Sequence, residues 1–344
     1  MGDFGNMGAK STVTHGVGTS VGVGFGFGFG RESAMRLIID GVVDGDGVPG
    51  LASRPVGEEA ITIQLPFRQP FDAATLFTFL GTRAVPGIES WDGETYARVL
   101  ALAHGNGTVA LRPLAATIEC TLRLDDWSDL EDAVARCRRM LDLDADPLAI
   151  DGRLGADPAL APLIAARPGL RSPTNADGAE LAVRAVLGQQ VSVVGARTLA
   201  GRLVQAIGEP LRSPIGSLTH AFPTSAAIAE LDPTHLAMPG SRKRALQGMC
   251  AALASGELVI GPGVDQAEMT ATMLALPGIG PWTVSYVAMR ALGDPDVFLP
   301  TDLGVRHGLE KLGLDGSPKA ALATSQSWSP WRSYALHHLW ANLG

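Results

Sequence analysis

Apolar residues follow two different periods along this chain, one in each half. Between residues 61 and 124 they alternate with polar residues over short runs, which is the pattern of half-buried strands. The alternation predicts strands at 61–67, 96–103, 108–114 and 117–124, with helical periodicity at 71–84 and 129–143. Strands with helices segregated between them indicate an antiparallel sheet covered on one face, in an α+β domain.

After Pro147 the strand signals give way to apolar stripes with a period of three to four residues. Such stripes run through 180–207 and 241–258, and Pro/Gly punctuation divides the region at 167–173 and 261–264. We therefore expect an α+β fold in which the amino-terminal domain, 58–152, is followed by a mostly helical, two-lobed domain, 153–344.

The segment 1–57 differs from both halves. It contains a Gly/Phe alternation ending at residue 30, which offers too few kinds of side chain to pack a core. A helical pattern at 31–43 follows and is too short to bury its own apolar face. We predict that residues 1–30 are disordered and lie outside the fold, and that the fragment with the helical pattern docks elsewhere or frays.

Composition narrows the class of protein. The chain has 344 residues, enough for two or three domains, and contains no uninterrupted run of about 18 apolar residues, so no membrane partner is expected. Its start lacks the features of a secretory signal, which favours a cytoplasmic location. Each of the three cysteines, Cys120, Cys137 and Cys250, falls on an apolar stripe and is expected in a core rather than in a disulfide or metal site.

The net charge of −8 argues against nucleic acid as a partner, but its distribution weakens that argument. Residues 1–150 hold 12 Lys and Arg against 20 Asp and Glu, while residues 151–344 hold 15 of each. An anion would therefore be bound by the neutral second half, through local geometry more than through a basic field.

One short motif, "LPGIGPWT" at 276–283, offers such a geometry. Gly278 and Gly280 permit positive φ and an unobstructed backbone, and Pro281 suits the first position of a helix. The free amides at that helix start favour a phosphate group. The motif alone is also compatible with an ordinary connection between two helices.

The flanking residues extend the motif. With "AVRAVLGQQVS" (182–192), "DVFLPTD" (296–302) and "PWRSYALHHLW" (330–340) in order, the chain resembles the helix-hairpin-helix superfamily of DNA glycosylases, and within it the AlkA type of 3-methyladenine DNA glycosylase II. The resemblance covers residues 58–344 and places the helix-hairpin-helix at 265–291. It implies base excision repair in double-stranded DNA, by hydrolysis of the N-glycosidic bond of alkylated purines such as 3-methyladenine and 7-methylguanine.

The resemblance makes Asp302 the catalytic residue. A carboxylate fixed under the sugar stabilises the positive charge that develops there and orients the attacking water. The alternative is a helix N-cap, a role that Asp also favours, and both roles are compatible.

Trp282 stands where the strand-cleaving members of the superfamily carry a lysine nucleophile, so a monofunctional enzyme without lyase activity is implied. Its ring and that of Tyr286, four residues on, share a helix face. With Trp340 they are expected to line an electron-rich pocket that attracts a cationic base, and Phe79 matches a further aromatic of that pocket. The alternative for all four rings is a place in the core.

Base flipping requires a probe that enters the minor groove. The resemblance places Gln189 and Gln190 there, with Gln189 in the substrate-binding set, and Gln190 departs from the leucine found in the best-known member. Further DNA contacts are expected from Gly278 and Gly280 in the hairpin, and from Arg244 in "SRKR" (241–244) and Arg332, for which a solvated charged surface is the alternative.

No cofactor is required by this chemistry, although the resemblance implies a monovalent cation on the backbone carbonyls of Leu274, Leu276 and Ile279. A monomer associated with the nucleoid is expected. Some family members are fused to an upstream regulatory module, so the segment 1–57 resembles a vestige of its helix-turn-helix. Two other function classes compete, a non-catalytic helix-hairpin-helix DNA-binding protein and a transcriptional adaptor. Asp302 with an aromatic pocket argues against the first, and the absence of a complete helix-turn-helix pattern argues against the second.

Overall fold

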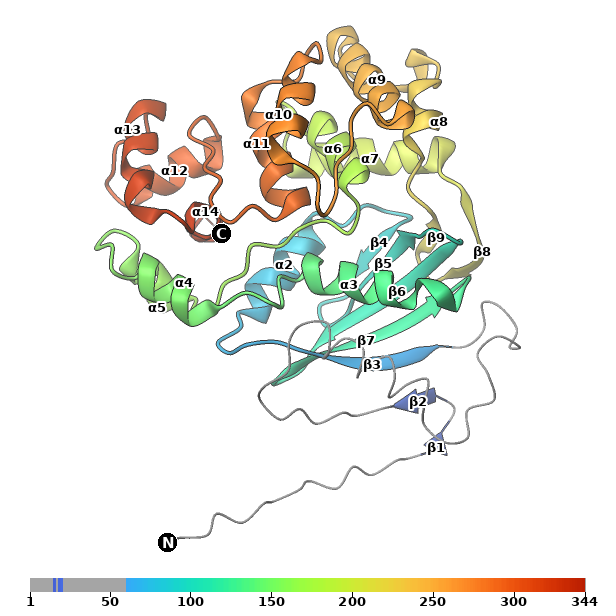
Figure 1. Ribbon diagram of the computed structural model, residues 1–344, viewed down its shortest axis with the longest axis horizontal. Coiled ribbons are helices and arrows are strands. Elements are labelled where there is room, and N and C mark those ends of the chain that lie inside the picture. The colour runs from blue at the N-terminus through green and yellow to red at the C-terminus, as the bar shows by residue number, and fades with distance from the viewer. Residues whose placement is uncertain (1–14, 17, 21–59, 344) are drawn as a thin grey trace, which may run out of the picture.

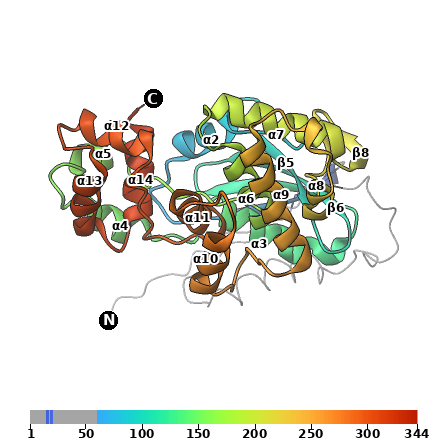
Figure 2. The same ribbon diagram turned by 90° about the horizontal axis from the view of Figure 1, so that it is seen from above.

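The computed structural model describes residues 15–16, 18–20 and 60–343. In Figure 1 a twisted sheet lies below a group of helices that runs from α6 to α11, and a second group, α4, α5 and α12–α14, lies to one side. The view from above in Figure 2 separates the same two helical groups. The antiparallel sheet followed by helical lobes confirms the predicted fold class.

The sheet has the strand order β1-β2-β3-β7-β6-β5-β4, and all neighbours are antiparallel except β2 and β3. The four predicted strands are confirmed, whereas β4 carries too few apolar residues to have been predicted. The strands are β1 (His15–Gly16), β2 (Gly18–Ser20), β3 (Ile61–Pro66), β4 (Glu89–Trp91), β5 (Tyr96–Ala101), β6 (Asn106–Pro113) and β7 (Thr117–Leu124).

The first core lies between this sheet and two helices, α2 (Ala73–Thr82) and α3 (Leu130–Met140), which follows the short helix η2 (Trp127–Asp129). Every second residue of β7 is fully buried, because successive side chains of a strand point to opposite faces. All three cysteines are free and buried, as expected, with Cys120 on β7 and Cys137 on α3 sharing this core.

Two strands of the segment 1–57 pair with the sheet, which corrects the prediction that residues 1–30 lie outside the fold. β2 extends the edge of β3 through Thr19 and Ser20, and β1 pairs with β2. An edge strand offers unpaired backbone groups, so pairing needs no varied side chains. The remainder of that prediction, including the helix-turn-helix vestige, falls outside the described residues.

Nearly all of the second half is helical, as predicted. Its elements are α4 (Pro147–Leu154), α5 (Ala161–Ala166), α6 (Gly178–Leu187), α7 (Val193–Ile207), α8 (Ser225–Ala229), η3 (Pro233–His235), α9 (Gly240–Ser255), α10 (Gln266–Ala275), α11 (Pro281–Val287), the π-helical turn η4 (Ala288–Leu292), α12 (Leu303–Lys311), α13 (Pro318–Thr324), η5 (Ser325–Trp328) and α14 (Arg332–Ala341).

The second core joins both helical groups. It includes Ile150 and Leu154 of α4, so the predicted boundary at 152/153 falls inside a helix that packs with the helical half. The apolar face of α4 is buried against that half and not against the sheet, which a sequence pattern cannot reveal.

A two-stranded hairpin interrupts the helical half and was not predicted. β8 (Pro210–Ile215) and β9 (Leu218–His220) meet at Gly216, whose φ is +57°. Leu211 and Leu218 of the hairpin pack against Val99 of β5 in a small third core. The Pro-Ile-Gly sequence at the turn was the available signal.

A buried ionic network joins the sheet to α6. Arg98 of β5 donates from Nη2 to Glu180 Oε2 at 2.7 Å, and Arg184 Nη1 lies 3.0 Å from Glu89 Oε2. Tyr96 donates its hydroxyl to Glu89 at 2.6 Å. Because each carboxylate faces two guanidinium groups, the charges are compensated inside the protein. The network fixes the sheet relative to α6, the helix that leads to the loop 188–192.

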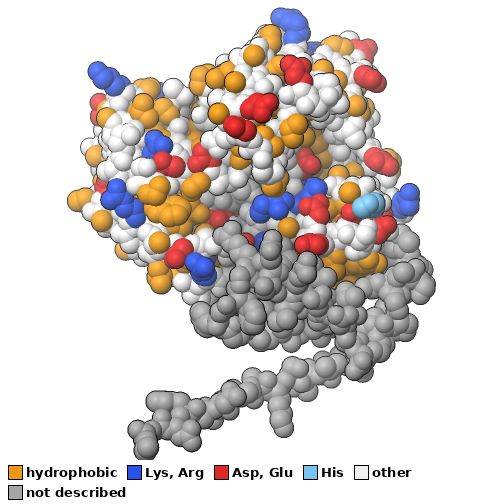
Figure 3. All heavy atoms as spheres, in the orientation of Figure 1, with side chains coloured by type: hydrophobic (Ala, Val, Ile, Leu, Met, Phe, Trp, Pro, Cys, Tyr) orange, Lys and Arg blue, Asp and Glu red, His pale blue; other side chains and the backbone are white. Residues whose placement is uncertain are grey.

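Basic and acidic side chains are interspersed over the face shown in Figure 3, which fits a chain without a dominant basic field. Among the residues described, no helix combines the length and the apolar character that a membrane crossing would need.

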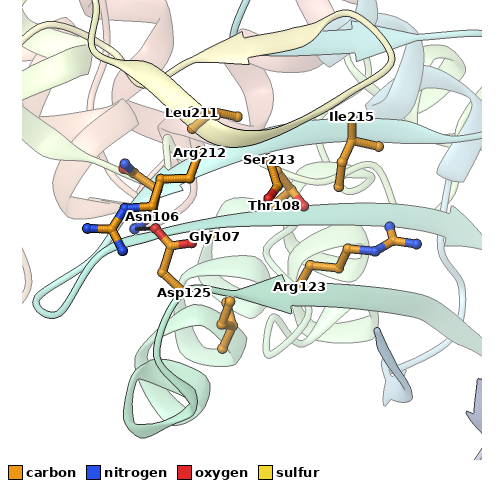
Figure 4. A pocket seen from close by; sticks show the side chains of 10 residues that line it. Asn106, Gly107, Thr108, Arg123, Asp125, Leu211, Arg212, Ser213 and Ile215 are labelled. Atoms are coloured by element: carbon orange, nitrogen blue, oxygen red, sulfur yellow. Dashed lines mark hydrogen bonds between the residues drawn. The ribbon is translucent and has the colours of Figure 1, made fainter. Parts of the chain in front are cut away.

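A small pocket lies between β6, β7 and β8 (Figure 4). Arg123, Asp125 and Arg212 line it, and its volume of about 30 Å³ leaves room for little more than ordered water. None of the predicted site residues lines this pocket, so it is separate from the candidate site.

Candidate active site

The helix-hairpin-helix is formed by α10, the turn 276–280 and α11, as predicted. Gly278 has φ +85°, and a Cβ on it would stand 2.7 Å from the Cβ of Ala245 on α9. Gly280 has φ −107°, which corrects the expectation of positive φ at both glycines, because Gly280 serves as the extended N-cap residue of α11. Pro281 is the first residue of α11, as expected.

Asp302 lies at the N-terminus of α12 and is half-buried. Its Oδ1 accepts the backbone N–H of Val305 at 3.0 Å, so the N-cap role weighed from the sequence is confirmed. The cap occupies one oxygen and holds the carboxylate at a fixed place on the surface of the helical half.

Two tryptophans from different helices donate hydrogen bonds to the same carboxylate. Trp340 of α14 donates its indole N–H to Asp302 Oδ1 at 2.9 Å, and Trp282 of α11 donates to Oδ2 at 3.1 Å. From the sequence, these tryptophans were expected close together only because both would contribute rings to an aromatic surface. The structure adds that their N–H groups orient the carboxylate, because ionised carboxylates accept strong hydrogen bonds.

Gly304 permits this arrangement and was missed by sequence reasoning. A Cβ at residue 304 would stand 2.9 Å from Cδ1 and 3.0 Å from Nε1 of Trp340, and 3.2 Å from Asp302 Oδ1. The glycine two residues after the Asp was visible in the sequence, but its partner, 36 residues further along the chain, was not.

The four predicted aromatic residues come together around this carboxylate. The rings of Trp282 and Tyr286 stack with centroids 5.1 Å apart, and those of Phe79 and Trp340 lie nearly parallel at 6.3 Å. Phe79 comes from α2 of the first domain, so the site is built where the two domains meet.

Two arginines of the site were not anticipated. The guanidinium carbon of Arg83 lies 3.7 Å from the centroid of the Phe79 ring, and that of Arg290 lies 4.6 Å from it. Burial lowers the pKa of Arg83 to about 10 and also lowers the pKa of Arg290, but Arg83 remains charged at neutral pH. Positive groups therefore already lie over the face of the Phe79 ring, a feature that the expectation of an electron-rich pocket did not include.

His337 of α14 completes this group, which we call the Phe79 cluster: Phe79, Arg83, Arg290 and His337. The His337 ring packs edge-on against Phe79 at 5.3 Å and against Trp340 at 5.1 Å. Burial and the nearby arginines hold the pKa of His337 well below its usual range, so the ring is neutral at pH 7.

The predicted probe lies between α6 and α7. Gln189 donates its side-chain N–H to Thr283 Oγ1 at 3.0 Å, which ties the end of α6 to the hairpin helix. Gln190 is exposed with φ +57°, a backbone conformation that non-glycine residues seldom adopt. Exposed Val191 and Val194 follow it and supply the apolar surface that Gln190 lacks.

Of the predicted basic contacts, Arg244 is exposed and precedes Ala245, which packs against the hairpin. Arg332 instead forms a two-pronged ion pair with Asp296, with Nε–Oδ1 2.8 Å and Nη2–Oδ2 2.9 Å. This pair holds α14 against the loop that leads to Asp302.

The carbonyls predicted to hold a cation lie in the same hairpin as Gly278. The Leu276 carbonyl accepts the N–H of Ile279 at 3.2 Å and retains one lone pair for a second partner. Leu274 lies at the end of α10, and its side chain is exposed. This geometry is compatible with a cation bound through oxygen atoms.

A hairpin between two helices, followed by a loop that delivers a fixed aspartate to an aromatic surface, defines the helix-hairpin-helix class of base excision proteins. Two family models match the chain, the AlkA N-terminal domain at residues 62–177 and the HhH-GPD superfamily base excision DNA repair protein at residues 183–333.

Similarity to individual relatives shows to which family within this superfamily the chain belongs. DNA-3-methyladenine glycosylase 2 of Escherichia coli is 36% identical over 287 residues, covering 81% of this chain and 97% of its own length. The probable bifunctional transcriptional activator/DNA repair enzyme AlkA of Mycobacterium tuberculosis is 49% identical over 283 residues, covering 82% of this chain. The matched part is 57% of the length of that relative. The chain belongs to the AlkA-type DNA-3-methyladenine glycosylase family of the HhH-GPD superfamily.

A solved structure supports the same fold. The 3-methyladenine DNA glycosylase from Archaeoglobus fulgidus matches with a TM-score of 0.70 at 20% identity, over 80% of this chain and 96% of its own. This likeness confirms the arrangement of sheet and helical lobes.

Proposed function

We propose that this protein is a monofunctional DNA glycosylase that hydrolyses the N-glycosidic bond of alkylated purines in double-stranded DNA. Family membership and the fold support a glycosylase. The observation that carries the proposal is the carboxylate of Asp302, held by two indole N–H groups beside the Phe79 cluster.

The carboxylate would act on the sugar of a flipped nucleotide. As the glycosidic bond breaks, its electron pair leaves with the base and positive charge develops on the deoxyribose. Asp302 stabilises that charge and orients the water that attacks C1′, and the water proton passes to solvent or to the carboxylate. A purine that already carries a positive charge from N-alkylation becomes neutral on leaving, so little acid catalysis is needed.

Trp282 argues for hydrolysis without strand cleavage. Its ring stacks on Tyr286 and its N–H is bonded to Asp302, so no amine stands at this position to attack the sugar. A Schiff base with the sugar requires such an amine. We therefore expect the enzyme to leave an intact abasic strand.

The DNA would lie across the hairpin and the loop 188–192. The backbone around Gly278 and Gly280 would contact phosphate, as would Arg244 and, if its ion pair with Asp296 opens, Arg332. The exposed loop with Gln190 and Val191 would fill the space left by the flipped base, at a cost of a few kcal/mol for unstacking. A monovalent cation on the carbonyls of Leu274, Leu276 and Ile279 would support the phosphate contact.

No other cofactor is required by this reaction. We further propose that the protein acts as a monomer in the cytoplasm, on the DNA of the nucleoid.

The decisive variant is Asp302→Asn. Asn retains an oxygen for the Val305 cap, so α12 keeps its N-cap. It removes the negative charge and turns an NH2 group toward an indole N–H that the carboxylate accepted. With methylated duplex DNA and chromatographic detection of released bases, we expect base release to fall at least about 100-fold. Strand breaks should be absent before heating, for both proteins.

Asp265→Asn is the matched control, because Asp265 also caps a helix, α10, through Ala267 and Glu268, and its side chain bonds to no aromatic residue among those described. It should retain normal base release. A wild-type protein that binds duplex DNA but releases no base would instead support the non-catalytic alternative.

A further inference from the structure

Arg290 is buried without a charged partner. It is 4% exposed, it lies on η4 between the two domains, and no carboxylate among the described residues is within ion-pair distance. Its Nε and Nη1 atoms are buried and have no hydrogen-bond partner in the described part of the chain. Buried donors are rarely left unpaired, and each exception calls for an explanation.

The position of this guanidinium points to a ligand. Its central carbon lies 4.6 Å from the centroid of Phe79 and 5.9 Å from that of Tyr286, two aromatic residues of the candidate site. Two other buried arginines, Arg98 and Arg184, instead face the carboxylates of Glu89 and Glu180.

A second unpaired group stands at the same ring. His337 is also 4% exposed, and its buried Nε2 has no partner among the described residues. Both residues therefore bring polar atoms to the ring that lies parallel to Trp340.

We propose that Arg290 and His337 determine base specificity, by hydrogen bonding to the acceptor edge of the flipped base. An arginine fork matches the carbonyl oxygen and ring nitrogen along the edge of a purine such as hypoxanthine. The inference rests on the proposed glycosylase function and refines its substrate range.

The charge of Arg290 determines whether the site favours neutral or cationic bases. Positive groups on the faces of Phe79 repel a cationic base and attract an acceptor, and both effects are strong where water is excluded. Neutral purines with a carbonyl oxygen are therefore held by the site, while cationic purines such as 3-methyladenine are removed because their glycosidic bonds are weak.

The test compares two substrates in one protein preparation. Single-turnover release of hypoxanthine from a defined duplex is measured beside release of 3-methyladenine from methylated duplex DNA. For Arg290→Met we expect the ratio of hypoxanthine release to 3-methyladenine release to fall at least about tenfold, because a site that donates hydrogen bonds loses more on the substrate that accepts them. His337→Leu should shift the ratio of the two rates in the same direction.

Arg83→Met is the matched control. It removes another positive charge beside Phe79, but the Arg83 Nη1 already donates to the carbonyl of Phe79 and to Thr82, so it has less to offer a base. We expect its ratio of rates to change less than about threefold, since a charge effect alone discriminates weakly.

The outcomes separate the two proposals. A wild-type protein that releases neither base refutes the glycosylase. A wild-type protein that releases both, with an unchanged ratio in Arg290→Met and His337→Leu, refutes the specificity role alone. An equal loss on both substrates assigns a structural role to Arg290, and an equal ratio shift in Arg83→Met shows that charge, not hydrogen bonding, selects the base.

Discussion

The Asp302 carboxylate performs a structural and a chemical task through different contacts. Oδ1 caps α12 and accepts the Trp340 N–H, while Oδ2 accepts the Trp282 N–H. Each of these partners comes from a different element, so the carboxylate is held from three sides. Such preorganisation favours electrostatic catalysis, because the group needs no reorientation when charge develops.

A substitution at Gly304 tests whether the contact between Trp340 and Asp302 matters for activity. Because a Cβ there would stand 2.9 Å from Trp340, Gly304→Ala should displace the indole from Asp302. We expect base release to fall about 10- to 100-fold, since small displacements of catalytic groups are costly. Gly248→Ala on α9, where a Cβ meets no described atom within 4 Å, is the control and should retain full activity. Equal rates for both variants would contradict this account of Gly304.

The helix-hairpin-helix combines two glycines with different duties. Gly278 needs its conformation, since φ is +85° and α9 lies directly against it. Gly280 needs neither, because its φ is ordinary and the space around it is open. A glycine that the fold does not require indicates that something else approaches its backbone closely.

A pair of alanine substitutions separates these duties. Gly278→Ala should lower the free energy of unfolding by about 1–3 kcal/mol, because a left-handed conformation strains any side chain. Gly280→Ala lacks that strain and should lower it by no more than about 1 kcal/mol, the cost of alanine at an N-cap, and still weaken binding to duplex DNA. Denaturant unfolding and a fluorescence binding assay measure the two effects, and unchanged DNA affinity in Gly280→Ala would remove the phosphate contact from the proposal.

Across the whole molecule, the site depends on two cores that meet. Phe79 lies on α2, which packs on the sheet, and Arg83 is the C-cap residue of that helix, whereas Asp302 and the tryptophans belong to the helical half. The ionic network of Glu89, Arg98, Glu180 and Arg184 fixes one half relative to the other. A small rotation between the halves would separate the rings before either core lost its packing.

Stability should depend on pH through buried groups of the helical half. Burial lowers the pKa of His338 to about 4, below its ordinary value of about 6.5, so the unfolded chain binds a proton that the folded chain does not. The folded state therefore loses stability as pH falls from about 6.5 to 4, by up to about 1.4 kcal/mol per pH unit. In His338→Gln this contribution should vanish, which thermal unfolding across that pH range measures.

The contribution of Asp142 to the pH dependence of stability has the opposite sign, and Asp142→Asn tests it. Burial raises the pKa of Asp142 to about 6, so the folded chain holds a proton that the unfolded chain has lost, and stability decreases as pH rises from about 4 to 6. Relative to wild type, this variant should gain stability as pH rises through that range. The same slope in both variants would show that neither group titrates as described.

The sequence by itself determined the elements and the chemistry carried by motifs. Alternation predicted β3, β5, β6 and β7, because its signal lies in short segments. The resemblance carried by the motifs located the hairpin, Asp302 and the four aromatic residues. Each depends on neighbours within a few residues, which the printed sequence displays.

Only the tertiary structure decided what these residues face. The bond from Trp340 to Asp302, the closeness of Gly304 to that indole and the two guanidinium groups on Phe79 each join segments far apart in the chain. Burial and long-range contact are properties of the packed molecule, so no local pattern encodes them. For that reason the sequence predicted the aromatic residues around Asp302, and only the folded protein shows that two guanidinium groups lie over the ring of Phe79.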